Sequence, residues 1–270
     1  MSYVDGLAGY MAIMDVEFKH IYKYKAEVIT NLIRTLISPL AIIVVWGLVY
    51  AASGSASING FSGSAFFAYF IISSAVAAVA VNAGIAFDMQ ADIKGGGIVV
   101  NLVKPMSYPL LLVFAGAAEA TTDGLTVLLP TFAITLLLLN VSISLPAMAL
   151  FLAELVMIYM LTTLIFFIIG CLSSVFVNIN GMVNLILWTF NVLGGRLIPL
   201  NLMPQSIAGA IQYSPFYLIY YLPSATFTGI ESSKFLMQGM FNMVIWTAAF
   251  AVLAALTWKA SKKKVMASGG

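Results

Sequence analysis

Residues 146–177 have the sequence PAMALFLAELVMIYMLTTLIFFIIGCLSSVFV, in which Glu154 is the single charged side chain. A helix needs about 20 mainly apolar residues to cross the hydrocarbon core of a bilayer, which is about 30 Å thick. This stretch is therefore predicted to span a membrane. Composition agrees, because 62% of the 270 residues are hydrophobic and 8% are charged, whereas about a quarter of the residues in soluble domains are charged.

Five other stretches meet the same criterion of length and composition. The six predicted spans cover about residues 29–52, 64–87, 120–140, 146–177, 182–200 and 236–258. The segments between them are too short for a separate soluble domain. We therefore expect an all-α integral membrane protein in which a single transmembrane domain fills residues 1–270.

Two further helices are expected near the cytoplasmic membrane surface. Over residues 5–25, apolar and charged side chains follow separate helical faces, which is typical of an amphipathic surface helix. One helix over residues 105–140 would be about 54 Å long, which exceeds the hydrocarbon core. Residues 106–118 are therefore expected to form a separate interfacial helix, which would place Glu119 and Asp123 near the headgroups.

Residues 197–230 are apolar but are interrupted by four prolines. These are Pro199, Pro204, Pro215 and Pro223. Proline breaks a helix, and pieces of about ten residues cannot cross a bilayer. The segment is therefore predicted to form short re-entrant or surface helices on the outer side, between spans five and six.

The distribution of basic residues predicts the orientation. With six spans, ten of the 12 Lys and Arg residues lie at or near one side, and only Arg196 and Lys234 lie outside it. The positive-inside rule makes that side cytoplasmic. The protein is thus expected to be a multi-pass protein of the cell (plasma) membrane with both termini in the cytoplasm.

The residues needed for catalysis or cofactor binding are missing from the sequence. It has no phosphate-binding loop, and its single cysteine, Cys171, lies in an apolar run without other metal-ligand types nearby. The net charge of +2 comes from short scattered clusters, which gives no footprint for nucleic acid. We expect no catalytic residue, no metal site and no cofactor in this chain, so any ATP-driven work needs a partner.

A few polar side chains lie inside the predicted spans. Glu154 is about eight residues into span four, where an ionisable group is costly. It is either functional or a buried structural acid paired with a polar neighbour such as Arg196. Asn82 in span two, and Asn184 and Asn191 in span five, either form hydrogen bonds between helices or line a pathway.

The loop after span two is the longest charged interruption. Asp88 and Asp92 lie one turn apart on a helical continuation of the span, Lys94 follows, and three glycines at residues 95–97 end the helix. A short apolar stretch then leads to Lys104. These residues form either a docking helix for a cytoplasmic protein or a solvated connector.

Three parts of the chain together resemble the permease subunits of type-2 ATP-binding-cassette exporters. They are the surface helix, the inner loop Asp92-Ile93-Lys94-Gly95-Gly96-Gly97-Ile98 through Leu102-Val103-Lys104-Pro105, and the outer segment Gly194-Gly195-Arg196-Leu197-Ile198-Pro199-Leu200 through Met203-Pro204 and Ser214-Pro215-Phe216. Their joint order along nearly the whole chain carries the resemblance.

The resemblance implies a dimer of six-span permeases in which spans two and five line a central pathway. The short outer helices would close it, so Arg196, Pro199 and Pro204 are candidates for an outer gate. Separate cytoplasmic subunits would bind ATP and Mg²⁺, dock on the inner loop and drive export of a cargo such as a drug, lipid, peptide or glycan. The second permease copy could be identical or related.

Two other classes of membrane protein remain as alternatives. An ion-coupled secondary transporter would need coupling-ion sites near the midplane and discontinuous spans in related halves. It would transport in vesicles without ATP. A non-transporting scaffold or immunity subunit would assemble with an ATPase but show no ATP-dependent flux.

Overall fold

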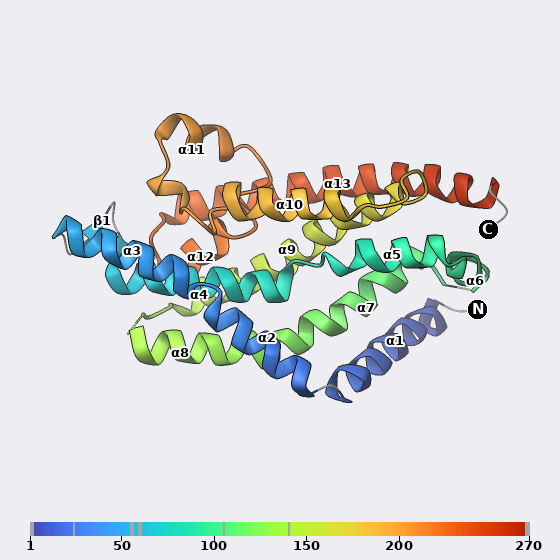
Figure 1. Ribbon diagram of the computed structural model, residues 1–270, viewed down its shortest axis with the longest axis horizontal. Coiled ribbons are helices and arrows are strands. Elements are labelled where there is room, and N and C mark those ends of the chain that lie inside the picture. The colour runs from blue at the N-terminus through green and yellow to red at the C-terminus, as the bar shows by residue number, and fades with distance from the viewer. Residues whose placement is uncertain are drawn as a thin grey trace.

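The computed structural model describes residues 3–23, 25–54, 57–58, 61–104, 106–139 and 141–267. In chain order its elements are α1 Tyr3–Lys23, α2 Lys25–Ile37, α3 Leu40–Ser53, β1 Ser57–Ile58, β2 Phe61–Ser62, α4 Gly63–Ala80, α5 Gly84–Lys94, α6 Gly97–Val103, α7 Tyr108–Asp123, the π-helix Gly124–Leu128, α8 Leu129–Leu139, α9 Leu145–Leu172, α10 Asn180–Leu193, the 3₁₀ turn Leu200–Leu202, α11 Gln205–Ile211, α12 Tyr221–Thr228 and α13 Ser233–Ala267. Figure 1 shows the long helices lying side by side along one axis.

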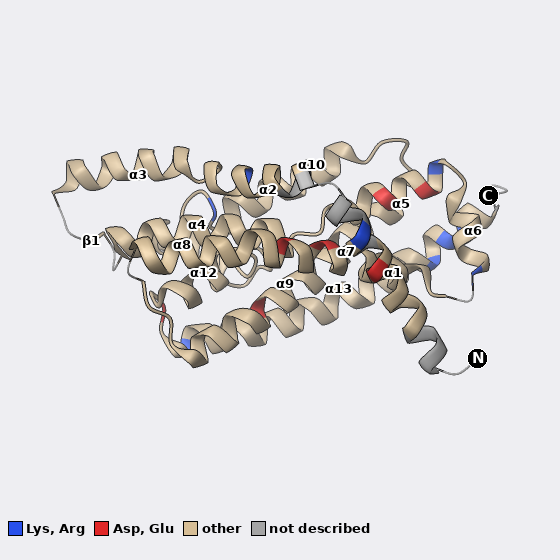
Figure 2. Ribbon diagram, turned by 90° about the horizontal axis from the view of Figure 1, so that it is seen from below, with Lys and Arg blue, Asp and Glu red and all other residues tan. Residues whose placement is uncertain are grey.

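Five helices of the described part are long and apolar enough to cross a membrane. They are Ile29–Ser53, Gly63–Lys94, Tyr108–Leu139, Leu145–Leu172 and Ser233–Met266. We refer to the end of the bundle that holds α6 as the α6 end and to the end that holds β1 and β2 as the hairpin end (Figure 1). In Figure 2, many of the basic residues lie toward the α6 end.

The first two of these helices contain breaks. Pro39 lacks a backbone N–H, and the chain turns at Ser38 and Pro39 between α2 and α3. The second helix is interrupted at residues 81–83, between α4 and α5, without a proline. Its start is conventional, because the Ser62 side chain caps α4 by accepting a hydrogen bond from the N–H of Ala65.

The third helix corrects one prediction. Residues 108–139 form a single helical rod of 32 residues, so the expected separation of residues 106–118 from the span is wrong. A π-turn lies directly before Pro130 in this rod. In it the N–H of Leu129 donates to the carbonyl of Gly124, and Pro130 itself has no backbone N–H to donate. Asp123 therefore lies near the middle of the rod, 8% exposed, and not near an end.

Helices α9 and α13 run in the same direction. Ala147 and Leu236, near their starts, line one pocket, and the Phe167 and Trp258 rings, near their ends, are 5.7 Å apart. The chain must therefore return along the bundle between them, and α10 lies in that return (Figure 1). A fifth span is predicted over residues 182–200, but the helix found there, α10 Asn180–Leu193, has 14 residues and is only about 21 Å long.

Two short helices follow α10, as the prolines predicted. α11 is mostly exposed, whereas every residue from Tyr221 to Phe227 in α12 is buried. The Tyr221 ring lies 6.1 Å from the rings of both Tyr69 and Phe235. The tyrosines of this segment differ in burial: Tyr213 is 76% exposed, but Tyr217, Tyr220 and Tyr221 belong to the protein core.

Helix α1 covers most of the segment predicted as a surface helix. The Tyr10 ring stacks on Phe114 at 5.2 Å, and its hydroxyl accepts a hydrogen bond from the N–H of Ser107. These contacts pack α1 along the start of α7. Pro105 at the end of the predicted inner loop, and the terminal residues Ser2 and Gly270, lie outside the described residues.

Candidate functional site

The break between α4 and α5 is stabilised by α9. The Thr162 hydroxyl donates to the carbonyl of Ala80 at 2.7 Å and accepts from the backbone N–H of Asn82 at 3.4 Å. The Asn82 side-chain amide donates to the hydroxyls of Thr163 and Tyr159, at 3.2 and 3.5 Å. Asn82, a predicted pathway residue, thus lies in the break between α4 and α5 and is hydrogen bonded to α9 of its own chain.

A glycine turn follows α10 and positions Arg196. Gly195 has a φ of +86°, a conformation that favours glycine, and its carbonyl accepts a 2.7 Å hydrogen bond from the hydroxyl of Tyr69. A Cβ atom at Gly195 would lie 2.9 Å from that hydroxyl oxygen and 3.0 Å from the Cβ of Tyr221. The turn is therefore packed tightly between α4 and α12.

The Arg196 guanidinium connects α10, α4 and the turn between α2 and α3. It donates to the Asn191 side-chain oxygen at 3.1 Å, to the Ser38 hydroxyl at 3.1 Å and to the Ser74 hydroxyl at 3.4 Å. It also lies over the Tyr220 ring, 5.6 Å from the centroid. All three hydrogen-bond acceptors are neutral, and neither Arg196 nor Arg34 forms a salt bridge with a carboxylate in the described part of the chain.

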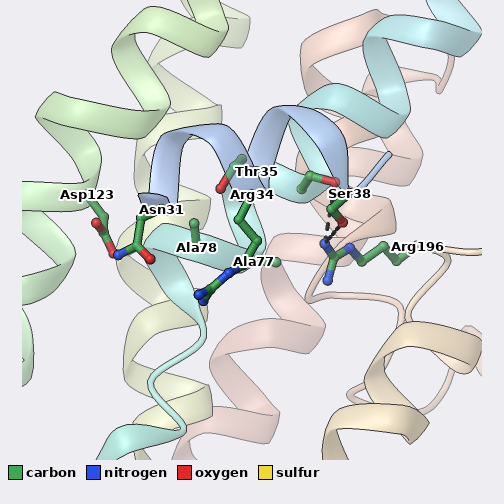
Figure 3. A pocket seen from close by; sticks show the side chains of 9 residues that line it. Asn31, Arg34, Thr35, Ser38, Ala77, Ala78, Asp123 and Arg196 are labelled. Carbon is green, nitrogen blue, oxygen red and sulfur yellow. Dashed lines mark hydrogen bonds between the residues drawn. The ribbon is translucent and has the colours of Figure 1, made fainter. Parts of the chain in front are cut away.

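Arg196 lines a polar pocket of about 430 Å³, which we call the arginine pocket. Its lining residues are Asn31, Arg34, Thr35, Ser38, Ser74, Ala77, Ala78, Asp123 and Arg196. Figure 3 shows Arg34 between Arg196 on one side and Asp123, beside Asn31, on the other. Ala78 and Asp123 each lie at the middle of a 32-residue span, so the pocket opens at mid-height of the bundle.

Sequence reasoning found only part of this pocket. The sequence predicts Arg196 as a gate residue and Asp123 as a residue near the headgroups, but it gives no prediction for Asn31 or Arg34. A polar face with a spacing of three to four residues, Asn31, Arg34 and Ser38, was the available signal in the first span.

The remaining predicted pathway and gate residues are dispersed. Asn184 is exposed on α10, whereas Asn191 donates to the carbonyl of Leu187 and accepts from Arg196. Pro199 is buried directly before the 3₁₀ turn, and Pro204 is exposed at the start of α11. Only Asn191 and Arg196 of this group touch each other through a hydrogen bond.

Glu154 is fully buried on α9 and its partner differs from the one suggested. The Thr226 hydroxyl of α12 donates to one carboxyl oxygen at 2.8 Å, and the other oxygen has no hydrogen-bond partner in the described part of the chain. Arg196 makes its hydrogen bonds elsewhere. The suggested Glu154–Arg196 pair is therefore absent, and Glu154 links α9 to the buried helix α12.

We expect Glu154→Gln to fold like the natural chain, because the amide oxygen can still accept from Thr226. Glu154→Ala should lower the free energy of unfolding by about 3 kcal/mol, since it leaves a cavity and an unpaired hydroxyl. Unfolding of both variants by sodium dodecyl sulfate in mixed micelles would measure this. A Glu154→Gln variant that folds normally but abolishes transport-linked ATP hydrolysis would instead make Glu154 a functional acid.

The charged inner loop forms a rigid elbow over residues 88–104. One Asp92 carboxyl oxygen accepts from the Asn101 amide of α6 at 3.0 Å and from the Tyr108 hydroxyl of α7 at 2.8 Å. Lys104 donates to the Asn101 side-chain oxygen at 2.7 Å. Asp92 therefore joins α5, α6 and α7, which sequence reasoning did not predict.

Glycines allow the elbow to turn this tightly. Gly96 has a φ of +73°, and a Cβ atom at Gly97 would lie 3.0 Å from an Asp92 carboxyl oxygen. Around this frame, Asp88, Lys94 and Lys104 are exposed. On α6 itself, Val100 is 61% and Val103 is 80% exposed.

These features define a multi-pass helical membrane protein with a polar pocket at mid-height and a rigid charged elbow at one end. The family model described as "ABC-2 family transporter protein" matches residues 36–269. The chain therefore belongs to this family, whose members are membrane permease components of ATP-binding-cassette transporters. Among curated proteins, none matches the chain significantly.

Proposed function

We propose that this chain is the permease subunit of an ATP-binding-cassette exporter, which works as a dimer and is driven by separate ATPase subunits. The observation that carries the proposal is the elbow. It is short, held rigid by Asp92, continuous with α5, and presents Val100 and Val103 beside exposed charges. An element of this kind can transmit movement of a docked ATPase directly into a span.

Six crossings complete the proposed topology. Because α9 and α13 are parallel, an odd number of crossings must lie between them, and α10 with the glycine turn is the segment available for one. The α6 end and its basic residues then face the cytoplasm, with α1 at that surface and both termini inside. The short helices α11 and α12 belong to the outer half in the cell membrane.

The division of labour follows from the chemistry of the two parts. This chain supplies the pathway. Its proposed elements are the break at residues 81–83, the glycine turn near Arg196, and the polar residues Asn82, Asn184 and Asn191. Pro199 and Pro204 would frame the outer gate. ATP and Mg²⁺ would be bound by the partner subunits, so that this chain itself catalyses nothing. Exposed Asp88, Lys94 and Lys104 would set the register of docking, since complementary charge determines partner choice.

The double substitution Val100→Glu and Val103→Glu tests the docking surface. Both side chains are mostly exposed, so the permease should still fold and insert. Two unpaired carboxylates buried under a docked subunit should weaken ATPase binding by more than about tenfold. Co-purification of the partner ATPase subunit with the permease, together with its hydrolysis rate in the complex, gives the measurement.

The matched control is Lys234→Glu. It reverses an exposed charge at the start of α13, which lies away from the α6 end. It should leave the yield of ATPase and its hydrolysis rate unchanged. If the double valine variant retains the ATPase at the yield of the control, the elbow is a connector and the docking proposal is wrong.

A further inference from the structure

The arginine pocket holds two guanidinium groups and one carboxylate inside the predicted membrane region. An arginine in a membrane-spanning segment is costly, and such residues usually face a water-filled cavity or a substrate pathway. Arg34 comes from the first span, and Arg196 comes from the turn after α10. Segments far apart in sequence thus bring two permanent positive charges to one pocket.

The neighbours of Arg196 hold its guanidinium in a fixed orientation without neutralising it. Three of the five N–H donors that an arginine side chain carries go to Asn191, Ser38 and Ser74, which are all uncharged acceptors. Ser74 is 3% exposed, so part of this support is buried. A guanidinium held in this way retains donors for a ligand.

Arg34 stands differently in the same pocket. It is exposed on α2, and Figure 3 shows it beside Ala77, between the other charged groups. Among the described residues, no hydrogen bond or salt bridge fixes its side chain. Asp123 lies on the far side beside Asn31, so the part of the pocket between Arg34 and Arg196 is positive (Figure 3).

We propose that the arginine pocket binds a phosphate group of the transported cargo between Arg34 and Arg196. Planar guanidinium groups match the geometry of phosphate and form charge-assisted hydrogen bonds with it. The volume of about 430 Å³ falls within the range of small-molecule sites. This inference rests on the proposed permease function and specifies the substrate class of its pathway.

A binding experiment on the purified chain in phosphatidylcholine nanodiscs tests the inference. One arm titrates inorganic phosphate at constant ionic strength, and the other replaces part of the lipid by phosphatidic acid. A ligand that binds only the folded chain raises the melting temperature, and the stabilisation grows with the logarithm of one plus the ratio of the free ligand concentration to Kd. A response to phosphate indicates a water-soluble anionic cargo, whereas a response to phosphatidic acid alone indicates a lipid headgroup.

The test variant is Arg34→Gln, because Arg34 supports no described contact and its loss should not unfold the chain. It should weaken binding of the responding probe by about tenfold, the loss expected for one hydrogen bond to a charged group. Lys234→Gln, which removes an exposed charge outside the pocket, should bind like the natural chain.

The proposal is overturned if the natural chain responds to neither probe, or if Arg34→Gln responds as the natural chain does. Neither measurement involves the ATPase. A failed binding test would therefore leave the docking result intact, and a failed docking test would leave the pocket result intact.

Discussion

Replacement of Gly195 by alanine is expected to lower the free energy of unfolding by about 3 kcal/mol. The added methyl group meets two obstacles: a φ of +86° that L side chains rarely adopt, and a Tyr69 hydroxyl oxygen only 2.9 Å away. The same hydroxyl donates to the Gly195 carbonyl, so moving it aside also breaks a buried hydrogen bond. Unfolding by sodium dodecyl sulfate in mixed micelles is a suitable measurement.

Two other glycines separate the causes. Gly229 also has a positive φ, +66°, but no atom lies within 4 Å of an added Cβ, so Gly229→Ala should show the conformational strain alone, about 1 kcal/mol. Gly209 in α11 has neither constraint, and Gly209→Ala should be neutral or slightly stabilising. A Gly195→Ala variant as stable as Gly229→Ala would show that the turn is not tightly packed.

Thr162→Val should be the second large effect, because valine has nearly the same shape but no hydroxyl. The change leaves the carbonyl of Ala80 and the N–H of Asn82 without their partner in an apolar region. Each unsatisfied group costs about 1–3 kcal/mol, so we expect the free energy of unfolding to fall by about 2–6 kcal/mol. The break between α4 and α5 should become the first region to exchange its amide hydrogens.

Thr163→Val and Thr189→Val are matched controls for this substitution. Thr163 accepts from the Asn82 side chain and not from the backbone of the break, and its loss should cost about 1 kcal/mol. Thr189 bonds to a carbonyl of its own helix, so its loss should have little effect. Equal stabilities for Thr162→Val and Thr189→Val would mean that water satisfies the break.

The apolar runs were sufficient to predict most of the architecture. Length and composition identify helices that reach across a bilayer, and four of the proline positions correctly forecast short helices after α10. The error lay in the continuity of residues 108–139, where Glu119 and Asp123 suggested an interface. A long rod tolerates Asp123 because α2 and α4 bring other polar groups to it, and such neighbours are invisible in a local window.

The candidate site was less predictable, since its contacts join distant parts of the chain. Asp92 was identified as a charge for a partner, yet its bonds to Asn101 and Tyr108 make it a structural group. Glu154 was recognised as a costly buried acid, but its partner Thr226 follows it by 72 positions. Spacing can indicate that a polar group needs a partner; only the packing of helices selects which one.

The link between Glu154 and Thr226 also has a consequence for the order in which the protein is made. When α9 leaves the ribosome, the segment that carries Thr226 has not yet been synthesised. The Glu154 carboxyl group therefore enters the membrane without the hydrogen bond that it later accepts from Thr226. Helix α12 can be enclosed only after α13 has arrived, because the Phe235 ring of α13 packs against Tyr221. Enclosure of α12, and with it of the contact between Glu154 and Thr226, therefore waits until α13 has been inserted.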